Sequence, residues 1–324
     1  MTIEFVLPGK EPERLLEKKD TLVGDSGTIV EKNNGVYKFA AADNYTNNFG
    51  YQWNRFDKTQ LDGHHSTVNQ SKDRFFAVTR WQENGLENQN ILEVGSGAGR
   101  FSRVILQNTK ANLYSVDYSN AVEANYKNNG PNDRFYIFQA SIYELPFAPA
   151  QFDKVVCFGV LQHTPDFEQS IKCLADMVKP GGELVVDFYP IRGWWTKIHA
   201  KYLFRPYTKK LGHEKLMQWI ESNIDWLIRM YMTFDKLGLH NLTRFLPICD
   251  IKNTLPRNLN SEQLREWAIL DSFDMFSPEY DNPQKTETVV HWFKNNGLIN
   301  VKSDIFQIDN NEITTVRGYH QESQ

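Results

Sequence analysis

Cysteine is scarce in this chain, which has three in 324 residues: Cys157, Cys173 and Cys249. An odd number of widely separated cysteines fits neither a disulfide framework nor a zinc ribbon, so reduced thiols are expected. The sequence also lacks any apolar run near the roughly eighteen residues that a membrane-spanning helix needs. Residues 1–20 carry Glu, Lys and Arg without an apolar stretch, unlike a signal peptide. These absences predict a cytoplasmic protein without a transmembrane segment.

An excess of one charge sign is missing as well. The chain has 36 Lys and Arg against 40 Asp and Glu, a net charge of −4, so nucleic acid is not expected as a partner. With 40% hydrophobic and 23% charged residues, it is neither mainly disordered nor collagen-like. The pair His64–His65 has no further ligand pattern nearby, so no metal site is predicted.

The order of apolar runs predicts an α/β fold. Strands are expected at residues 90–94, 112–117, 134–139, 154–160 and 183–188, separated by helix-sized segments, which is typical of βαβ units in a parallel sheet. A helix at 286–297 and a hairpin of residues 299–308 and 312–319 are expected to close the sheet. The predicted organisation is an N-terminal extension (1–88, with one short strand at 35–39), the first part of the core (89–190), a helical insertion (191–283) and the C-terminal part of the core (284–324).

A glycine-rich loop follows the first core strand: Glu93-Val-Gly-Ser-Gly-Ala-Gly-Arg-Phe101. Gly95, Gly97 and Gly99 allow a tight turn whose backbone can lie against a ligand at a helix N-terminus. A mere strand-to-helix turn is the simpler alternative. Arg100 stands where a dinucleotide fold needs its third glycine, which disfavours NAD or FAD.

Asp117 ends the second core strand, 22 residues after Gly95. A carboxylate at this point can accept hydrogen bonds from both hydroxyls of a ribose. A helix-capping aspartate is the alternative, although Ser119 could cap equally well.

These motifs, with others in the same order, resemble those of class I S-adenosylmethionine-dependent methyltransferases, in particular bacterial small-molecule or sugar-type enzymes. The matching segments are Ile91-Leu-Glu-Val-Gly-Ser-Gly-Ala-Gly-Arg-Phe-Ser102, Val116-Asp117, Leu145-Pro-Phe147, Phe152-Asp-Lys-Val-Val156, His163-Thr-Pro-Asp166 and Lys179-Pro-Gly-Gly182. The resemblance implies a Rossmann-like, mostly parallel seven-stranded sheet with helices on both faces and a final antiparallel strand. Residues 191–283 would be a helical lid insertion, and the N-terminal extension would be small.

The resemblance also implies S-adenosyl-L-methionine as cofactor. The glycine loop would contact its methionine part, Asp117 its ribose and Tyr118 its adenine, while Ser141 stands where the family often has an aspartate. The residues expected to bind the cofactor are Glu93, Gly95, Ser96, Gly97, Gly99, Asp117, Tyr118, Ser141, Ile142 and Phe158. Arg74 and Arg80 are candidate partners for its carboxylate, with a solvated helix face as the alternative.

His163 follows the fourth core strand, at the edge where the methyl group should emerge, and is the candidate catalytic residue. As a general base it would make the rate rise with pH through about 6.5, the ordinary pKa of histidine. A histidine that only packs on the cofactor or caps the next helix is the alternative. The residues expected to contact the acceptor are Tyr45, Trp53, Tyr189, Asp271 and Tyr280.

The insertion has two further patterns. Between Phe188 and His213 there is no acidic residue, while aromatic residues alternate with Arg192, Lys197, Lys201, Arg205, Lys209 and Lys210. This stretch is interpreted as a lid or a homodimer contact, or as a surface for an anionic or lipid-linked acceptor. Next, apolar residues from Leu216 to Phe234 recur at helical spacing, and Trp219 and Trp226 predict that this helix buries a second face as well.

The predicted function is S-adenosylmethionine-dependent methyl transfer to a hydroxyl or amine of a small-molecule or sugar-like acceptor. The alternatives left open are an RNA or lipid-linked acceptor, and a non-catalytic module that binds S-adenosylmethionine.

Overall fold

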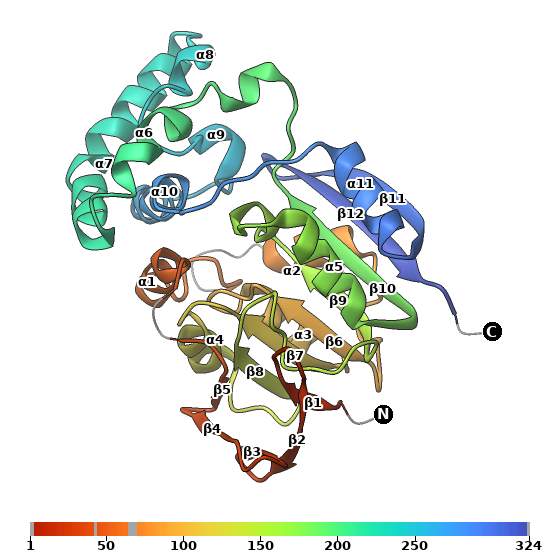
Figure 1. Cartoon of the computed structure of the whole chain (residues 1–324). Coiled ribbons are helices and arrows are strands. Elements are labelled where there is room, and N and C mark those ends of the chain that lie inside the picture. Colours follow the sequence, from red (N-terminus) through yellow and green to blue (C-terminus); the bar gives the residue numbers. More distant parts are fainter. Residues whose placement is uncertain (1–2, 42–43, 64–69, 323–324) are drawn as a thin grey trace.

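The computed structural model describes residues 3–41, 44–63 and 70–322. Within these ranges the strands form one mixed sheet in the order β1-β2-β3-β4-β5-β8-β7-β6-β9-β10-β12-β11. Helices cover both faces of the sheet, and a separate group of helices stands beyond the carboxyl ends of its parallel strands (Figure 1). No helix in the described ranges has the length and hydrophobicity needed to cross a membrane.

The centre of the sheet is parallel and buried. Its strands are β6 (Asn90–Val94), β7 (Asn112–Asp117), β8 (Phe135–Gln139), β9 (Phe152–Cys157) and β10 (Val178–Phe188). Every residue of β6 is buried, as expected when helices cover both faces of a parallel sheet. The strands predicted at 90–94 and 112–117 match β6 and β7 at both ends. The prediction at 154–160 runs too far, because Gly159 turns the chain with a φ of +71°.

An antiparallel hairpin closes one edge. The helix α11 (Thr286–Asn295) ends before Gly297, whose φ is +78°, and β11 (Leu298–Ile308) then pairs with β12 (Asn311–His320). Strand β12 lies antiparallel beside β10, so the last strand joins the sheet in the direction opposite to its neighbour. The hairpin predicted from residues 299–319 is confirmed.

The prediction of a seven-stranded sheet is wrong, because the sheet of described residues has twelve strands. The N-terminal extension adds five: β1 (Phe5–Leu7), β2 (Glu13–Lys18), β3 (Thr21–Gly24), β4 (Ile29–Asn33) and β5 (Val36–Lys38). Neighbours among them pair antiparallel, and β5 then pairs parallel with β8. These strands have three to six residues each, so most are too short to show the alternating apolar pattern that reveals a strand in a sequence.

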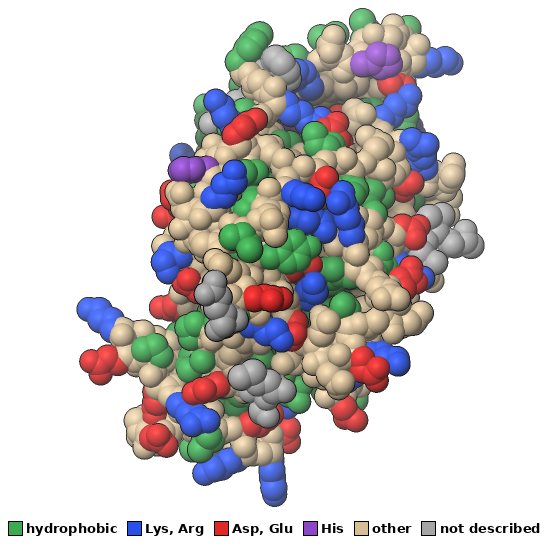
Figure 2. Space-filling view, turned by 90° about the vertical axis from the view of Figure 1, so that its right-hand side faces the viewer, with side chains coloured by type: hydrophobic (Ala, Val, Ile, Leu, Met, Phe, Trp, Pro, Cys, Tyr) green, Lys and Arg blue, Asp and Glu red, His purple; other side chains and the backbone are tan. Residues whose placement is uncertain are grey.

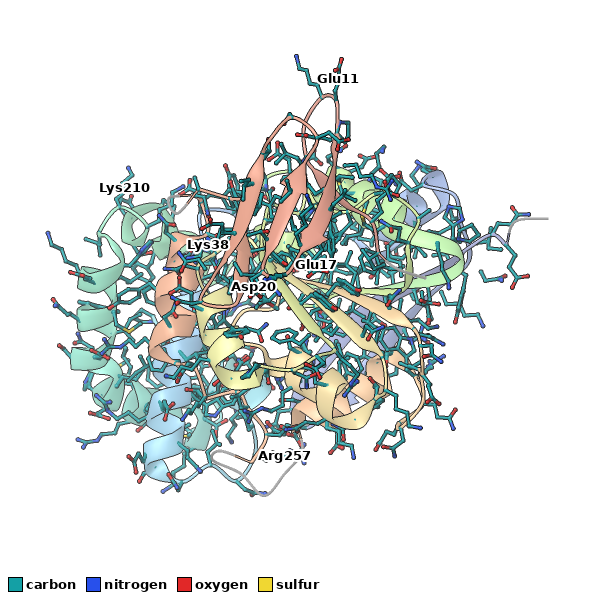
Figure 3. The ribbon with its side chains drawn as sticks, turned by 90° about the horizontal axis from the view of Figure 1, so that it is seen from below. Glu11, Glu17, Asp20, Lys38, Lys210 and Arg257 are labelled. Atoms are coloured by element: carbon teal, nitrogen blue, oxygen red, sulfur yellow. The ribbon has the colours of Figure 1, made fainter. Side chains whose placement is uncertain are left out.

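A small number of aromatic side chains attach this ribbon to the core. Tyr37 stacks on Phe138 with ring centroids 5.4 Å apart, and Phe5 lies 5.7 Å from the same ring. Figure 3 shows Glu11 at the outer tip of the ribbon formed by β1 to β5, whereas Lys210 lies by the helices of the insertion. Because Tyr37 and Phe5 are buried against the sheet, the extension is part of the main core and not an appended arm.

Alternate residues of each central strand point to opposite faces of the sheet. Ile91 packs with α2 (Gln70–Thr79), α3 (Arg100–Asn108) and α4 (Val122–Asn129), while Leu92 packs with α5 (Phe167–Met177) and α11. Asp166 caps α5 by accepting a hydrogen bond from the Gln169 backbone N–H at 2.9 Å. The predicted arrangement of helices on both faces is confirmed.

The insertion is helical and has an apolar core of its own. Its elements are η2 (Trp194–Lys197), α6 (Ala200–Thr208), α7 (His213–Lys236), α8 (His240–Thr243), α9 (Ile251–Thr254) and α10 (Ser261–Phe276). The helical spacing from Leu216 to Phe234 belongs to α7. Only one face of α7 is deeply buried, however, because Trp219 and Trp226 are 42% and 57% exposed. The prediction of a second buried face is therefore wrong.

The basic residues of the 188–213 stretch are mostly neutralised within the molecule. Lys201 and Arg205 both contact the buried carboxylate of Asp281, at 2.9 and 2.8 Å. Lys209 pairs with Glu279 at 2.7 Å, and Arg192 pairs with Glu312 at 3.0 Å; the side chain of Lys197 lies outside the described part of the chain. Figure 2 likewise shows both charge signs interspersed on the face it presents. The basic stretch therefore joins the insertion to other segments and does not form a free cationic surface.

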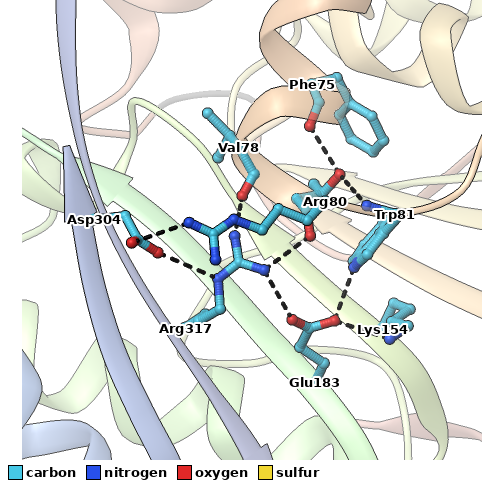
Figure 4. A network of polar contacts seen from close by, with 9 residues as sticks. Phe75, Val78, Arg80, Trp81, Lys154, Glu183, Asp304 and Arg317 are labelled. Carbon is cyan, nitrogen blue, oxygen red and sulfur yellow. Dashed lines mark hydrogen bonds and ion pairs between the residues drawn. The ribbon is translucent and has the colours of Figure 1, made fainter. Parts of the chain in front are cut away.

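A buried polar network links strand β12 of the C-terminal hairpin to the end of α2 and to the neighbouring strand β10 (Figure 4). Arg317 on β12 is 4% exposed; it donates to the Thr79 carbonyl at 3.0 Å and lies 3.4 Å from Glu183 on β10. The Glu183 carboxylate also accepts from the Trp81 indole N–H and from Lys154, both at 2.8 Å. Removal of either central charge would leave its buried partner undercompensated.

The variant Arg317→Met should therefore lower the free energy of unfolding by about 3–5 kcal/mol, the usual loss when one partner of a buried ion pair is removed. Urea denaturation measures this change. The control Arg192→Met breaks an ion pair whose side chains are 50% and 38% exposed, so it should cost less than about 1 kcal/mol. Equal losses in the two variants would contradict a stabilising role for the buried network.

Candidate functional site

A cleft of about 1030 Å³, including its open mouth, lies at the carboxyl ends of β6 to β9. In parallel sheets ligands bind at this edge. The helix α1 (Asn47–Arg55) lies between α4 and the helices of the insertion (Figure 1). Of the residues predicted from the sequence, those that line the cleft are Tyr45, Trp53, Gly95, Ser96, Gly97, Asp117, Tyr118, Ile142, Phe158 and His163.

The glycine loop forms the floor of the cleft. Gly95 has a φ of +84°, and a Cβ there would lie 2.1 Å from a methyl carbon of Val160, so a side chain is excluded. Gly97, with a φ of +52°, faces the Trp53 indole, 3.2 Å from where its Cβ would be. The Ser96 hydroxyl is buried without a hydrogen-bond partner among the described residues. The loop thus presents backbone and one unsatisfied hydroxyl to a ligand.

Asp117 restrains this loop from the end of β7. Its carboxylate accepts from the Gly97 N–H at 2.8 Å, and from the backbone N–H and hydroxyl of Ser119 at 2.8 and 2.7 Å. Burial raises the pKa of Asp117 above its ordinary value, while these hydrogen bonds oppose the shift. Asp117 therefore lines the cleft and also supports the following turn, but it does not cap α4, whose N-cap residue is Ala121.

Aromatic residues from α1 form the opposite wall. Thr46, Phe49, Trp53 and Phe56 lie three or four positions apart, so they share one face of the helix, and all four line the cleft. Just before the helix, the Tyr45 ring lies 5.3 Å from Tyr118 and 5.4 Å from Tyr280. The wall is thus apolar, but it has the electron-rich ring faces that attract cations.

His163 ends the short helix η1 (Leu161–His163) after β9 and is 6% exposed. Its Nδ1 lies 3.0 Å from the Tyr280 carbonyl oxygen. Because a carbonyl only accepts, Nδ1 must carry the proton, which leaves the lone pair of the neutral ring on Nε2. Burial lowers the pKa of His163, against the opposing effect of Asp274 and Asp281. The contact with Tyr280 fixes the tautomer, and the lowered pKa favours a neutral imidazole at pH 7.

Three predicted cofactor residues do not line the cleft. Glu93 is 4% exposed and accepts hydrogen bonds from Ser102 and Ser115 at 2.5 and 3.1 Å, and burial raises its pKa to about 7. Gly99 precedes α3 with no room for a side chain, because its Cβ would meet Asn125 at 2.2 Å. The Ser141 hydroxyl accepts from the backbone of the turn after β8. In the structure these residues build the frame beneath the loop and the strand ends.

The predicted acceptor residues divide similarly. Tyr45 and Trp53 line the cleft, whereas Tyr189, Asp271 and Tyr280 do not. Tyr280 fixes His163 through its carbonyl, and the Tyr189 and His163 rings are nearly perpendicular, with centroids 5.9 Å apart. Burial and the neighbouring Asp274 raise the pKa of Asp271 to about 7.

The arginines proposed for the cofactor's carboxylate are engaged elsewhere. Arg74 pairs with Asp187 at 2.6 Å, and Arg80 pairs with Asp304 at 3.0 Å on the side of the Arg317 network. Arg100 lines the cleft in their place, with its Nε donating to the Ser71 hydroxyl at 2.8 Å. His64 and His65 lie outside the described residues, and within the described ranges no group of His, Cys, Asp and Glu is arranged to hold a metal.

The sequence interpretation missed two kinds of cleft residue. Phe49 could have been found, since it shares the helical spacing of Thr46, Trp53 and Phe56. Asp274 on α10 also lines the cleft, but it is more than a hundred residues from His163 in a segment with no recognisable motif. Only the folded chain brings Asp274 to this site.

The segment that forms much of this cleft is similar in sequence to known methyltransferases. Residues 92–186 match a family model described as a methyltransferase domain. Over 153 residues the chain is 30% identical to a ubiquinone biosynthesis O-methyltransferase of Coxiella burnetii, covering 44% of this chain and 65% of that protein. It is also 26% identical to an uncharacterized protein of Synechococcus sp., covering 64% of this chain and 46% of that protein. The chain thus spans about half to two thirds of the length of these relatives.

A solved structure of phosphoethanolamine N-methyltransferase 2 from Haemonchus contortus superposes with a TM-score of 0.46 and 13% identity, covering 85% of this chain and 61% of that one. The matched segment carries the glycine loop, Asp117 and His163 of the cleft. Residues 92–186 therefore form a methyltransferase domain, in agreement with the class I S-adenosylmethionine-dependent methyltransferases that the motifs resemble. The predicted cofactor, S-adenosylmethionine, agrees with this family.

The variant Asp117→Asn should weaken S-adenosylmethionine binding by about 1–3 kcal/mol, the usual contribution of a hydrogen bond to a charged group. Asparagine keeps one acceptor for Ser119, so it perturbs the fold less than alanine would. Isothermal titration calorimetry measures the affinity. The control Asp133→Asn alters an exposed acid before β8, away from the cleft, and should bind normally. Unchanged affinity in a folded Asp117→Asn variant would exclude Asp117 from the binding site.

Proposed function

We propose that this chain transfers the methyl group of S-adenosylmethionine to a hydroxyl or amine of a small-molecule or sugar-like acceptor. The observation that carries the proposal is the position of His163, a neutral imidazole with a free Nε2 on the wall of the same cleft as the glycine loop and Asp117. A cleft that brings a base and a nucleotide-type loop together supports catalysis better than binding alone.

The residues of the cleft fit the proposed cofactor. Gly95 and Gly97 admit a close approach of the backbone, and Ser96 offers a buried hydroxyl with no partner among the described residues. Asp117 would accept from the ribose, and the aromatic face of Trp53 would favour a sulfonium cation. Bound S-adenosylmethionine supplies an electrophilic methyl carbon, and the chain's task is to position the acceptor in line with it and to exclude water.

The roles of the other residues follow from their places. His163 would take the acceptor's proton at Nε2, and the Tyr280 carbonyl would hold the ring in the required tautomer. The helices α1 and α10 would cover the acceptor, which gives residues 191–283 the role of a lid. The internal pairing of Lys201, Arg205 and Lys209 supports a small acceptor over RNA or a lipid-linked one.

The variant His163→Ala should lower turnover about 100- to 10,000-fold, the usual contribution of a general base, and leave S-adenosylmethionine affinity nearly unchanged. The measurement is S-adenosylhomocysteine release with a methylated acceptor, beside calorimetry for the cofactor. The control His240→Ala alters an exposed histidine that contacts Asp235, remote from the cleft, and should keep full turnover. A loss below about tenfold in His163→Ala would rule out the base role.

The pH profile provides a second test of the same role. Because burial lowers the pKa of His163, the rate should rise with pH through a midpoint below about 6.5, and not at 6.5 as for a solvated histidine. This acidic limb should disappear in His163→Ala. If the chain binds S-adenosylmethionine but releases no S-adenosylhomocysteine with any compound of a broad acceptor screen, the result would favour a non-catalytic module.

A further inference from the structure

Asp274 is the acid of the cleft wall whose carboxylate has no partner among the residues that the structure describes. Three acids line the cleft: Asp57, Asp117 and Asp274. Asp117 accepts three hydrogen bonds from the loop and the following turn, and Asp57 pairs with Lys127 at 2.7 Å. No hydrogen bond or ion pair to Asp274 is found among the described residues. A carboxylate so placed requires a donor from a ligand or from water.

The cations nearest to Asp274 are committed to another acid. Lys201 and Arg205 contact Asp281 directly, which keeps the pKa of Asp281 at about 2. They lower the pKa of Asp274 only through space, while burial raises it. The charge of Asp274 is therefore only partly compensated by the protein.

Asp274 and His163 face the same cleft and form no direct ion pair in the described structure. Both residues are part of the lining of this cleft, although they lie more than a hundred residues apart in the chain. Both present acceptors: the carboxylate oxygens of Asp274 and the Nε2 lone pair of the His163 tautomer fixed by Tyr280. A hydroxyl has one proton and can satisfy one of them, whereas a primary ammonium has three protons and can donate to both.

The surrounding rings suit the same ligand. Phe49 lies 5.1 Å from the His163 ring, and Tyr45 packs between Tyr118 and Tyr280. Aromatic faces attract a cation. A cleft lined by such rings and by the carboxylate of Asp274 thus suits a positively charged group.

From this arrangement we infer that Asp274 recognises a primary or secondary ammonium group, and that the methyl acceptor is a small amine. The inference rests on the proposed function and narrows its acceptor. The ammonium donates one N–H to Asp274 and passes another proton to His163 Nε2, which becomes cationic. The neutral nitrogen then forms the N–C bond to the methyl group as the C–S bond breaks and its electron pair remains on sulfur. The methylated ammonium carries the positive charge, and His163 returns its proton to water.

The test uses benzylamine and benzyl alcohol, a pair of the same shape that suits aromatic walls and differs in charge. Calorimetry on the full chain saturated with S-adenosylhomocysteine should show benzylamine binding at least tenfold more tightly than benzyl alcohol. Asp274→Asn should remove this preference by weakening benzylamine at least tenfold, and it should leave benzyl alcohol and S-adenosylhomocysteine affinities unchanged. The control Glu262→Gln, an exposed acid at the start of α10, should keep the preference. Circular dichroism verifies that both variants fold.

The outcomes separate the two proposals. Equal or undetectable binding of the two compounds, or an Asp274→Asn variant that keeps the preference for the amine, overturns the amine site. Failure of the chain to bind S-adenosylmethionine or S-adenosylhomocysteine at all overturns the proposed function itself. Turnover with hydroxyl acceptors that does not depend on Asp274 leaves the methyltransferase function standing and rejects the amine inference.

Discussion

The hydrogen bond from His163 Nδ1 to the Tyr280 carbonyl joins the methyltransferase core to the segment that returns from the insertion. Two bonds from Asn282, to the Gln162 carbonyl at 2.7 Å and the Thr164 carbonyl at 3.0 Å, reinforce the same junction. Through these contacts the end of β9 and the end of α10 become parts of one cleft. The tautomer of the candidate base and the position of Asp274 both depend on the junction.

Part of the cleft comes from the segment that matches the methyltransferase family model, and the rest comes from segments outside that match. The matched residues 92–186 contribute the glycine loop, Asp117, Ile142, Phe158 and His163. The N-terminal segment contributes the aromatic face of α1, and the insertion contributes Asp274. The aromatic face of α1 and Asp274 thus complete, from outside the match, the cleft wall that His163 begins.

Charge pairing explains how the insertion is held. Asp281 is 2% exposed at its side chain and contacts both Lys201 and Arg205. Arg205 also donates to the Met275 carbonyl, so α6 is tied to the end of α10. Buried pairs of this kind add little net stability against an apolar alternative, but a misplaced partner would be costly. They therefore favour one placement of the insertion over others.

The sequence by itself determined the sheet centre and the place of the glycine loop and Asp117 at the carboxyl ends of its strands. Runs such as 90–94 and 112–117 are buried on both faces, so a local pattern of apolar residues reveals these strands. The glycines and Asp117 lie at or directly after the ends of the strands, so the sequence reveals their positions as well. Of the N-terminal strands, only the one at residues 35–39 was predicted, and it corresponds to β5. The other four were not predicted because they are too short to show a clear alternating apolar pattern. Only the tertiary structure decided which groups pair with Arg74, Arg80 and the basic stretch. It also decided that Asp274 and His163 line the same cleft. Each of these features depends on contacts between segments far apart in the chain. The burial and charge pairing that stabilise such contacts leave no local pattern in the sequence.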